Sequence, residues 1–444
     1  MRQQTEAEAG AAASARGAAV SLTIPLVTAA LEHGSPSGRR KIPIARPDIG
    51  PRELELVTQV LGSDVLALGP FAQRFEAAAA ALAGRREGIA CSSGTAGLHM
   101  SVRALGLGEG DEVITTPFSF VASANCLLYE RAIPRFVDIE EDSLGMDPDL
   151  VESAATSRTR AILPVHVFGR PCRIEPLVAT ARRRGWAVIE DACEGLGSSI
   201  GGRSLGSFGD MATFAFYPNK QITTGEGGMV VTDDPALAEL VRSLRNQGRD
   251  SDGTWLRHVR LGYNYRLDEL SAALGVAQLE RLGEMQRGRA RVVRAYERLL
   301  GGLDWLMLPR AGADESVDWF VYVVQLAPEL DRDAIIGRLA ASGVSARPYF
   351  SPLHLQPFYR DAFGYRPGDF PVTERVAATT LALPFSSRLA DEDVQYVADA
   401  LIDAVAGLLE DGPAASSGPR RLAGSPNARP FLGGNPTSRD RHEK

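Results

Sequence analysis

The stretch GDMATFAFYPNKQITTGEGGMVVTDD, residues 209–234, places a lysine between two apolar runs. The first run, ATFAF, mixes aromatic and β-branched residues as buried strands do. The second run, GMVVTD, follows a glycine-rich reversal. Lys220 is therefore expected on a turn between two buried strands. A lone turn lysine is usually a solvated surface residue, but enclosure by such strands disfavours the ammonium and favours a reactive amine.

A second stretch, WAVIEDACEGLG (residues 186–197), ends an apolar run in an acidic pair. Asp191 follows the predicted parallel strand at the edge where doubly wound sheets bind ligands. A lysine amine and an aspartate that faces a heterocyclic nitrogen are the two side chains that pyridoxal phosphate needs. The alternative role for Asp191 is the cap of a helix N-terminus. Together, Lys220 and Asp191 indicate an enzyme that uses this cofactor.

Apolar strands alternate with helical stretches over much of the chain, which indicates a mainly parallel α/β sheet. A long charged helix is expected near residues 268–300, and a smaller α/β unit follows it. The predicted strands of the first sheet are 111–116, 134–139, 161–169, 186–191, 212–216 and 228–233. The predicted elements of the smaller unit include 319–326, 333–344 and 391–405.

The 444 residues are enough for a large core and two domains. We predict a large cofactor-binding domain over residues 42–285 and a small C-terminal domain over 286–410. Residues 1–41 are rich in alanine, and residues 411–444 are poor in core-forming side chains. Both terminal segments are predicted to be disordered.

Five motifs resemble those of a known family when they are taken at their places along the chain. They are SSGTAGLH, TTPFSFVASAN, EDACEGLG, GDMATFAFYPNKQITTGEGG and LGYNYRLDELSAALGVAQLERL. The sequence is similar to the DegT/StrS-type sugar aminotransferases, a branch of the fold-type-I pyridoxal phosphate enzymes, from about residue 42 to about residue 405. The resemblance implies a large domain with a mainly parallel sheet and a smaller C-terminal α/β domain.

The resemblance also assigns residues to the cofactor ring. It implies that Lys220 bonds covalently to the cofactor and later moves a proton as the catalytic base, and that Asp191 pairs with the pyridine nitrogen. Glu194 is placed near the ring, although a solvated loop carboxylate is the alternative. Phe120 is the implied stacking residue. Phe118 is the other candidate, and each of the two phenylalanines is also compatible with a core position.

The cofactor phosphate is expected at the start of a helix. Free backbone N–H groups at Gly94, Thr95 and Ala96, with the Thr95 hydroxyl, form an anion site. SGT before a helix is usually only a cap, and the order of the family motifs favours the phosphate role. Many relatives carry a serine five residues before the lysine, where this chain has Ala215. The missing hydroxyl costs about 1 kcal/mol net.

The motif GYNYR implies a homodimer with shared active sites. In the family its asparagine reaches the phosphate of the partner's cofactor, which makes Asn264 the candidate here, with Arg266 a weaker one. Without the resemblance, Asn264 reads as a turn residue.

Four further residues are candidates for contact with the substrate. Arg347, Tyr349 and His354 lie in VSARPYFSPLHLQPFY, which is too irregular for either periodic element and borders the substrate pocket in relatives. A packed aromatic loop is the alternative. His166, in ILPVHVFGRPC, resembles a family position close to the cofactor, and a hydrogen-bonded core histidine is its alternative.

The implied activity is amino transfer from glutamate or glutamine to a keto sugar carried by a nucleotide, for a polysaccharide or an antibiotic. A keto-cyclitol substrate and a non-catalytic regulator are the alternatives. A dehydrating branch of the family replaces the lysine with histidine, so Lys220 argues against that branch.

The global properties exclude several other classes. A formal net charge of −7 gives no reason to expect nucleic acid or an anionic membrane as a partner. Cys91, Cys126, Cys172 and Cys193 lack the spacing of a metal site, and reduced cytosolic cysteines are the simplest interpretation. No run is long enough to span a membrane, and we expect a cytoplasmic protein without a bound metal.

Overall fold

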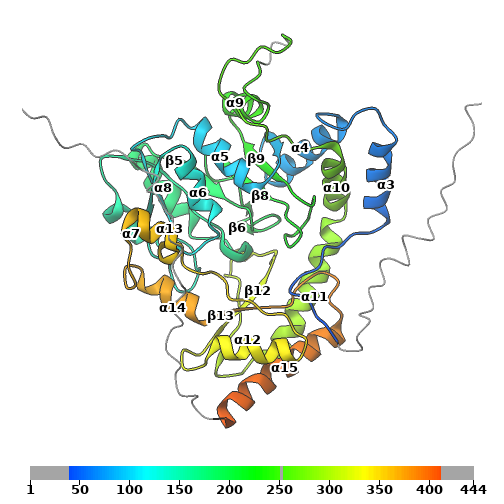
Figure 1. Ribbon diagram of the computed structural model, residues 1–444, viewed down its shortest axis with the longest axis vertical. Helices are drawn as coiled ribbons and strands as arrows, with labels where there is room; N and C mark the ends of the chain where they lie inside the picture. The colour runs from blue at the N-terminus through cyan, green and yellow to red at the C-terminus, as the bar shows by residue number, and fades with distance from the viewer. Residues whose placement is uncertain (1–39, 251–253, 412–444) are drawn as a thin grey trace, which may run out of the picture. The chain divides into compact units, whose positions relative to one another are not determined.

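The computed structural model describes residues 40–250 and 254–411 (Figure 1). From Ile42 onward the described chain forms one compact unit. The segments expected to be disordered lie almost wholly outside the described residues, so that expectation stays a prediction. Within the described ranges, no helix is long and apolar enough to cross a membrane. The same residues contain no cluster of His, Cys, Asp and Glu that could hold a metal ion.

A seven-stranded sheet forms the centre of this unit. Five of its strands run parallel to one another: β2, β3, β4, β5 and β8. The strand β9 runs antiparallel to β8, and β1 runs antiparallel to β9. The sheet is thus mainly parallel, as the alternation of strands and helices predicts. Its strands, in spatial order, are β1 (Glu87–Cys91), β9 (Gly228–Thr232), β8 (Met211–Ala215), β5 (Ala187–Asp191), β4 (Thr159–Ile162), β2 (Glu112–Thr115) and β3 (Ile133–Phe136).

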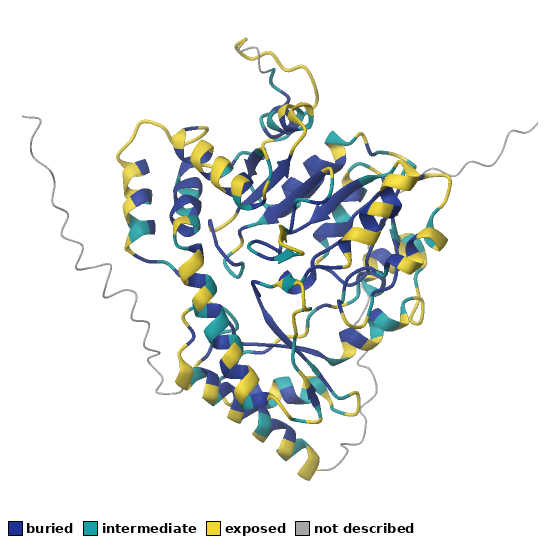
Figure 2. Cartoon of the chain, turned by 180° about the vertical axis from the view of Figure 1, so that it is seen from behind, coloured by how far each residue is buried: buried dark blue, intermediate teal, exposed yellow. Residues whose placement is uncertain are grey.

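Helices cover both faces of the sheet, and the side chains of one strand divide between two apolar clusters. Ala212 and Phe214 of β8 pack in one cluster with helices α3, α4 and α10, whereas Met211 packs in another with α5 and α9. The sheet strands are therefore buried on both sides (Figure 2), as parallel sheets are. The helices around the sheet are α3 (Pro51–Leu61), α4 (Pro70–Leu82), α5 (Gly94–Ala104), α6 (Ala122–Tyr129), α7 (Pro148–Ala154), α8 (Ile174–Arg184), α9 (Pro235–Arg245) and α10 (Glu269–Glu280).

Two predicted elements are shorter than expected. The long helix near 268–300 is broken at Arg281, where ψ is 4°, into α10 and α11 (Leu282–Leu300). The Arg281 guanidinium binds Glu53 and Asp48, so the break lies where this helix pair meets α3. The strand expected over 161–169 ends at Ile162, and the last residues of the expected range form a 3₁₀ turn, with φ of 59° at Phe168.

A second, three-stranded antiparallel sheet follows α11 in the sequence. Its core includes the stacked rings of Tyr296 and Tyr322. The predicted boundary between residues 285 and 286 falls inside α11, and the domain division stays a prediction. The elements here are β10 (Leu306–Met307), β12 (Tyr322–Leu326), β13 (Thr380–Leu383), α12 (Arg332–Ala341), α13 (Pro357–Phe363), α14 (Pro371–Thr379) and α15 (Asp391–Glu410).

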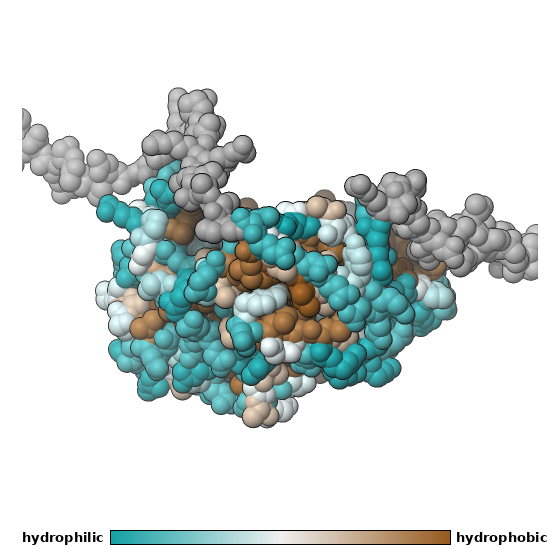
Figure 3. Space-filling view, turned by 90° about the horizontal axis from the view of Figure 1, so that it is seen from below, coloured by the Kyte–Doolittle hydropathy of each residue, from teal (hydrophilic) through white to brown (hydrophobic). Residues whose placement is uncertain are grey.

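The end of the unit that carries α12 and α15 is shown in Figure 3. Its surface is mostly hydrophilic, with hydrophobic residues gathered in the middle. Away from this end, a small sheet of β6 (Ser199–Ile200), β7 (Arg203–Ser204) and β11 (Glu315–Ser316) packs beside the large one.

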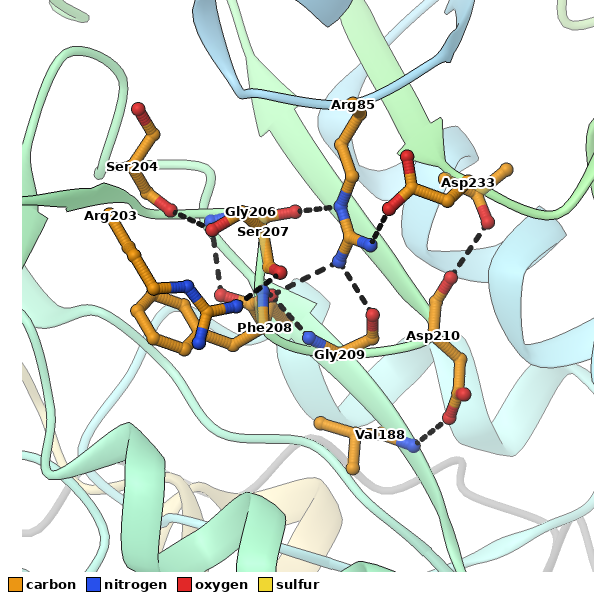
Figure 4. A network of polar contacts seen from close by, with 12 residues as sticks. Arg85, Val188, Arg203, Ser204, Gly206, Ser207, Phe208, Gly209, Asp210 and Asp233 are labelled. Atoms are coloured by element: carbon orange, nitrogen blue, oxygen red, sulfur yellow. Dashed lines mark hydrogen bonds and ion pairs between the residues drawn. The ribbon is translucent and has the colours of Figure 1, made fainter.

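A polar network fixes the loop that leads into β8 (Figure 4). Arg85 donates to the carbonyl oxygens of Gly206 (2.7 Å) and Gly209 (2.5 Å) and pairs with Asp233. The buried Glu190 carboxylate accepts the N–H groups of Gly206 and Gly209, and that of Phe208. The loop therefore has few alternative conformations, and the start of β8 is held against β5.

Candidate active site

Lys220 lies on a turn after β8 and is only 14% exposed at its side chain. Its N–H donates to the Tyr217 carbonyl. Its Nζ lies 3.2 Å from Glu194 Oε1 and 4.1 Å from the centre of the Phe320 ring. The lysine is thus enclosed rather than solvated, and its surroundings include a carboxylate as well as apolar side chains.

Asp191 ends β5 and is 4% exposed. Its backbone N–H donates to the Pro164 carbonyl, and its carbonyl accepts from His166. One carboxylate oxygen accepts from the Cys193 N–H at 3.1 Å, and the other accepts from the Ser123 hydroxyl at 2.6 Å. None of the described residues from 192 to 200 is helical, so the helix-cap alternative is wrong.

Glu194 connects the ends of β5 and β8. It is 6% exposed, which excludes the solvated-loop alternative, and its second oxygen accepts the N–H of Phe168 at 2.8 Å. Burial raises the pKa of Glu194, although the Lys220 ammonium opposes the shift and Asp191 adds to it. Asp191 and Lys220 both act electrostatically on Glu194 and on Cys193, so these four side chains share one site.

The start of α5 borders the same site. A Cβ added at Gly94 would lie 2.7 Å from the Ala215 Cβ and 2.9 Å from the Cys193 Sγ, so the chain approaches closely only because this residue is glycine. The first N–H groups of a helix have no acceptor within it, which leaves those of Gly94 and Thr95 for an anion. The Ala96 N–H donates to the Ser93 hydroxyl at 3.1 Å. The predicted anion site therefore has two free N–H groups, those of Gly94 and Thr95, rather than three.

Phe118 and Phe120 have opposite surroundings. Phe118 is fully buried, with its ring against those of Phe168 and Phe350. Phe120 is 60% exposed, so it is the ring that remains accessible to a ligand. It borders a recess of about 990 Å³, including space open to solvent, whose lining has no charged side chain. The lining residues are Ser119, Phe120, Val121, Asn125, Phe350, Ser351, Leu353, Gln356, Pro357, Phe358 and Tyr359.

His166 is fully buried. Its Nε2 lies 3.1 Å from Glu190 Oε2, and its Nδ1 accepts the Cys172 N–H at 3.3 Å. Both ring nitrogens are thus engaged within the protein, and this geometry favours the alternative of a hydrogen-bonded core histidine. Because Glu190 and Asp191 are neighbours in an extended strand, their side chains point to opposite faces. His166 therefore binds on the face away from Asp191.

The irregular loop brings Tyr349 toward Lys220. Burial and, after it, the charge of Glu194 raise the pKa of Tyr349, whereas the Asn219 amide and Arg347 oppose the shift. Asn219 directly precedes Lys220 in the chain, so Tyr349 faces the lysine turn. Arg347 is exposed and donates to the Ala346 carbonyl.

His354 lies deeper in the same loop and is fully buried. Its Nε2 lies 3.0 Å from Glu374 Oε1. Its Nδ1 is buried without a hydrogen-bond partner among the described residues. The N–H of Leu353 donates to the Pro117 carbonyl at 2.8 Å, so the loop is attached near the end of β2.

The GYNYR segment pairs with residues 244–247 and reaches the start of α5. The N–H groups of Tyr263 and Tyr265 donate to the Leu244 and Arg245 carbonyls. The two tyrosine rings stack at 4.9 Å. On the other side of this extended segment Asn264 is exposed. The geometry leaves its amide accessible to a second chain.

A side chain of α5 and one that directly follows α6 hold these two tyrosines. The Tyr263 hydroxyl donates to Glu130 at 2.6 Å, and the Tyr265 hydroxyl lies 3.2 Å from His99. The Nε2 of His99 lies 2.9 Å from the Oε1 of Glu130. Arg266 is already engaged, since it donates to Asn246 and Gln247.

Three residues of the site were missed by the sequence reasoning. Phe320 faces the Lys220 amine from a segment a hundred residues away, and no local pattern distinguishes it from a core residue. Ser123 binds Asp191, and Ser119 binds Ser123 at 2.7 Å. No local pattern distinguished these serines, because Ser119 lies in the irregular segment before α6 and the Asp191 partner of Ser123 is distant in the sequence.

Comparison with known proteins gives a consistent result. The family description "DegT/DnrJ/EryC1/StrS aminotransferase family" matches residues 47–402. GDP-perosamine synthase of Caulobacter vibrioides is 38% identical over 81% of this chain and 97% of its own length.

Solved structures are similar over comparable lengths. DesI, solved in the presence of its TDP-sugar product, is 34% identical with a TM-score of 0.77, over 83% of this chain and 94% of its own. A putative sugar aminotransferase from Streptococcus pneumoniae, in its PMP form, is 25% identical with a TM-score of 0.78, over 83% of this chain and all of its own. The fold-type-I prediction is confirmed. Both the sequence match and the fold show that this chain belongs to the DegT/DnrJ/EryC1/StrS aminotransferase family.

Proposed function

We propose that this chain transfers an amino group from glutamate or glutamine to a keto sugar carried by a nucleotide, with pyridoxal phosphate as its cofactor. The observation that carries the proposal is the meeting of Lys220, Asp191 and the start of α5 at one edge of the sheet. An amine, a carboxylate and a phosphate cradle are the three groups that this cofactor requires.

The residues of the site fit the cofactor. Asp191 is buried and each of its oxygens accepts one donor, which leaves acceptor capacity for a protonated ring nitrogen. The N–H groups of Gly94 and Thr95, at the start of α5, have no acceptor within the helix and are available for a phosphate. Phe120 offers an accessible ring for stacking. Asp191, Gly94, Thr95 and Phe120 would therefore hold the cofactor.

When bound, pyridoxal phosphate supplies an electron sink that stabilises negative charge on the substrate carbon. Lys220 would hold the cofactor, and its amine would take and return the proton at the substrate carbon. Glu194, whose pKa is raised by burial and which touches this amine, is placed to receive the proton that the ammonium must lose. Asp191 would hold positive charge at the ring nitrogen.

The nucleotide-linked substrate is supported by the relatives named above, one of which was solved with its TDP-sugar product. The recess beside Phe120 supports it as well, because uncharged walls with exposed aromatic rings suit a sugar and a base. Tyr349, Arg347 and His354 stay candidates for substrate contact. The donor amino acid is proposed from the family alone.

A keto-cyclitol is the second candidate substrate, since the site chemistry is the same for any cyclic ketone. A non-catalytic regulator is disfavoured, because a binding module has no need of a buried Lys220–Glu194 pair beside Asp191. The dehydrating branch is disfavoured by the lysine itself.

We further propose a homodimer in which Asn264 completes the partner's phosphate site, on the basis that its amide is exposed between two anchored tyrosines. We propose a cytoplasmic location, because the four cysteines are free and three of them are buried as ordinary core residues.

The test is a donor-dependent assay. The purified protein, loaded with pyridoxal phosphate, is incubated with glutamate or glutamine and a panel of nucleotide-linked keto sugars and keto-cyclitols. Conversion of the C=O group into a CH–NH₂ group raises the mass of the sugar by about one unit, and a 15N-labelled donor adds one more. Incorporation of label into a nucleotide sugar supports the proposal, and incorporation only into a cyclitol favours the second candidate. Failure to bind the cofactor would overturn both.

A further inference from the structure

Two buried hydroxyl groups form a hydrogen-bonded chain that ends at Asp191. Ser123, in the first turn of α6, lies 2.6 Å from Asp191 Oδ2, and Ser119 lies 2.7 Å from Ser123. The exposed fractions of Ser119, Ser123 and Asp191 are 3%, 1% and 4%. Groups this deeply buried are shielded from water, so their hydrogen bonds are with one another rather than with solvent.

The direction of these hydrogen bonds follows from the chemistry of the groups. A carboxylate only accepts hydrogen bonds, so Ser123 donates to Asp191. The oxygen of Ser123 is then free to accept, and Ser119 donates to it. The other Asp191 oxygen accepts the Cys193 N–H. Each oxygen of the carboxylate therefore has one fixed donor, and the plane of the carboxylate is set.

The same short segment also carries the proposed stacking residue. Between the two inward serines, Phe120 is 60% exposed, and its carbonyl accepts the Ser123 N–H in a tight turn. Residues 119–123 thus reach Asp191 on one side and present an aromatic ring on the other. A shift of this turn moves both groups together.

We propose that Ser123 is a positioning residue that orients the Asp191 carboxylate toward the ring nitrogen of the cofactor, and that Ser119 orients the Ser123 hydroxyl. This inference rests on the proposed function. The χ2 torsion of an aspartate has a broad energy well, so without Ser123 only the Cys193 N–H restrains the carboxylate. A hydrogen bond to a charged group is stronger than one between neutral groups.

Loss of the Ser123 hydroxyl is expected to weaken positive charge at the ring nitrogen. A carboxylate with one donor fewer is more basic and competes better for the shared proton. The nitrogen of Lys220 that is bonded to the cofactor would then keep its proton to higher pH. The reason is that a smaller positive charge at the ring nitrogen repels that proton less. The other titratable groups that face Asp191 are Cys126, Cys193 and Glu194, with Lys220 itself, and no variant below alters them.

The experiment is a pH titration of the visible absorbance of the cofactor-loaded protein, with turnover and cofactor affinity measured separately. In Ser123→Ala the midpoint should rise by on the order of one unit, and the rate of the amino-transfer half-reaction should fall roughly tenfold. Ser123→Thr keeps a hydroxyl and should titrate close to the unsubstituted protein. Ser119→Ala should give a smaller shift in the same direction.

Ser101→Ala is the matched control. Ser101 is also a fully buried helix serine, but its hydroxyl donates to the Gly97 carbonyl and does not touch Asp191. A shift in Ser101→Ala equal to that in Ser123→Ala, or an unshifted Ser123→Ala, would overturn the inference while leaving the proposed function intact. If Ser123→Ala does not fold, an unshifted Ser119→Ala overturns it. If the unsubstituted protein binds no cofactor at Lys220, the proposed function fails first.

Discussion

The Nζ of Lys220 lies 3.2 Å from the Oε1 of Glu194, inside a site where both side chains are largely shielded from water. The pair joins two strand ends: Glu194 follows β5, and Lys220 follows β8. Because burial raises the pKa of Glu194, the carboxyl group takes a proton more readily than a surface glutamate. Glu194 is therefore a proton acceptor within hydrogen-bonding distance of the Lys220 nitrogen.

Borohydride reduction of the protein loaded with pyridoxal phosphate should fix the cofactor to Lys220. The chain has only three lysines, Lys41, Lys220 and Lys444, so peptide mass spectrometry gives an unambiguous answer. Lys220→Ala should lower turnover by at least about a hundredfold, as expected for loss of a catalytic base. Lys41→Ala, at an exposed position, is the control and should keep full activity. Label recovered on Lys41 or Lys444 instead would remove Lys220 from the mechanism.

Asp191→Asn should slow the amino-transfer half-reaction more than it weakens cofactor binding. The amide carries no negative charge to hold a proton at the ring nitrogen. Its NH₂ group would also face the Ser123 hydroxyl or the Cys193 N–H, each of which donates to a carboxylate oxygen in the native protein. Rapid mixing with glutamate measures the half-reaction, and cofactor fluorescence measures binding. Equal half-reaction rates in the two proteins would restrict Asp191 to a structural role.

The two residues closest to the proposed chemistry were predictable because Asp191 ends a strand, and Lys220 follows one, whose apolar pattern is local. A parallel sheet brings the carboxyl ends of its strands to one edge, so Lys220 and Asp191 were expected together. Ser123 was not, because its bond to Asp191 spans 68 residues. The break at Arg281 was missed for the same reason. Its ion pairs with Asp48 and Glu53 join segments more than two hundred residues apart, and helical periodicity gives no indication of them.

Glu190 should make stability depend on pH on the acid side. Burial by itself raises its pKa, but hydrogen bonds from His166 and from the Gly209 and Phe208 N–H groups outweigh burial and lower it. The unfolded chain therefore binds this proton at higher pH than the folded chain does. The stabilisation is complete above the unfolded pKa near 4.3 and is lost as the pH falls through the lower folded pKa.

Glu190→Gln removes that charge and turns an NH₂ group toward N–H donors, which should cost about 1–3 kcal/mol of unfolding free energy at pH 7. Urea unfolding of the apoprotein from pH 3 to pH 8 measures the difference from the unsubstituted protein. The difference should be constant above about pH 5 and shrink below it. Glu109→Gln, at an exposed carboxylate, is the control. A difference that grows toward acid pH would contradict the lowered pKa.

The last prediction concerns the proposed shared site and is tested by mixing two inactive proteins. If Asn264 holds the phosphate of the partner's cofactor, Lys220→Ala and Asn264→Ala chains form hybrid dimers in which one site has both native residues. In a 1:1 mixture about half of the dimers are hybrids with one complete site each, so activity should recover to about a quarter of the unsubstituted level. Limiting cofactor keeps the Asn264→Ala parent impaired. Gln73→Ala, at an exposed amide on α4, is the matched control and should be active by itself.

The alternative is that Asn264 acts within its own chain. The Tyr265 carbonyl accepts the N–H of Ser92 at 2.8 Å, two residues before Gly94, so Asn264 is also near the phosphate cradle of its own chain. If Asn264 acts there, a hybrid dimer has one site without Lys220 and one without Asn264, and mixing restores nothing. Dilution separates the two cases again, because cofactor affinity falls with dimer dissociation only if the site is shared. Affinity that is constant across dilution, together with absent rescue, would assign Asn264 to its own chain.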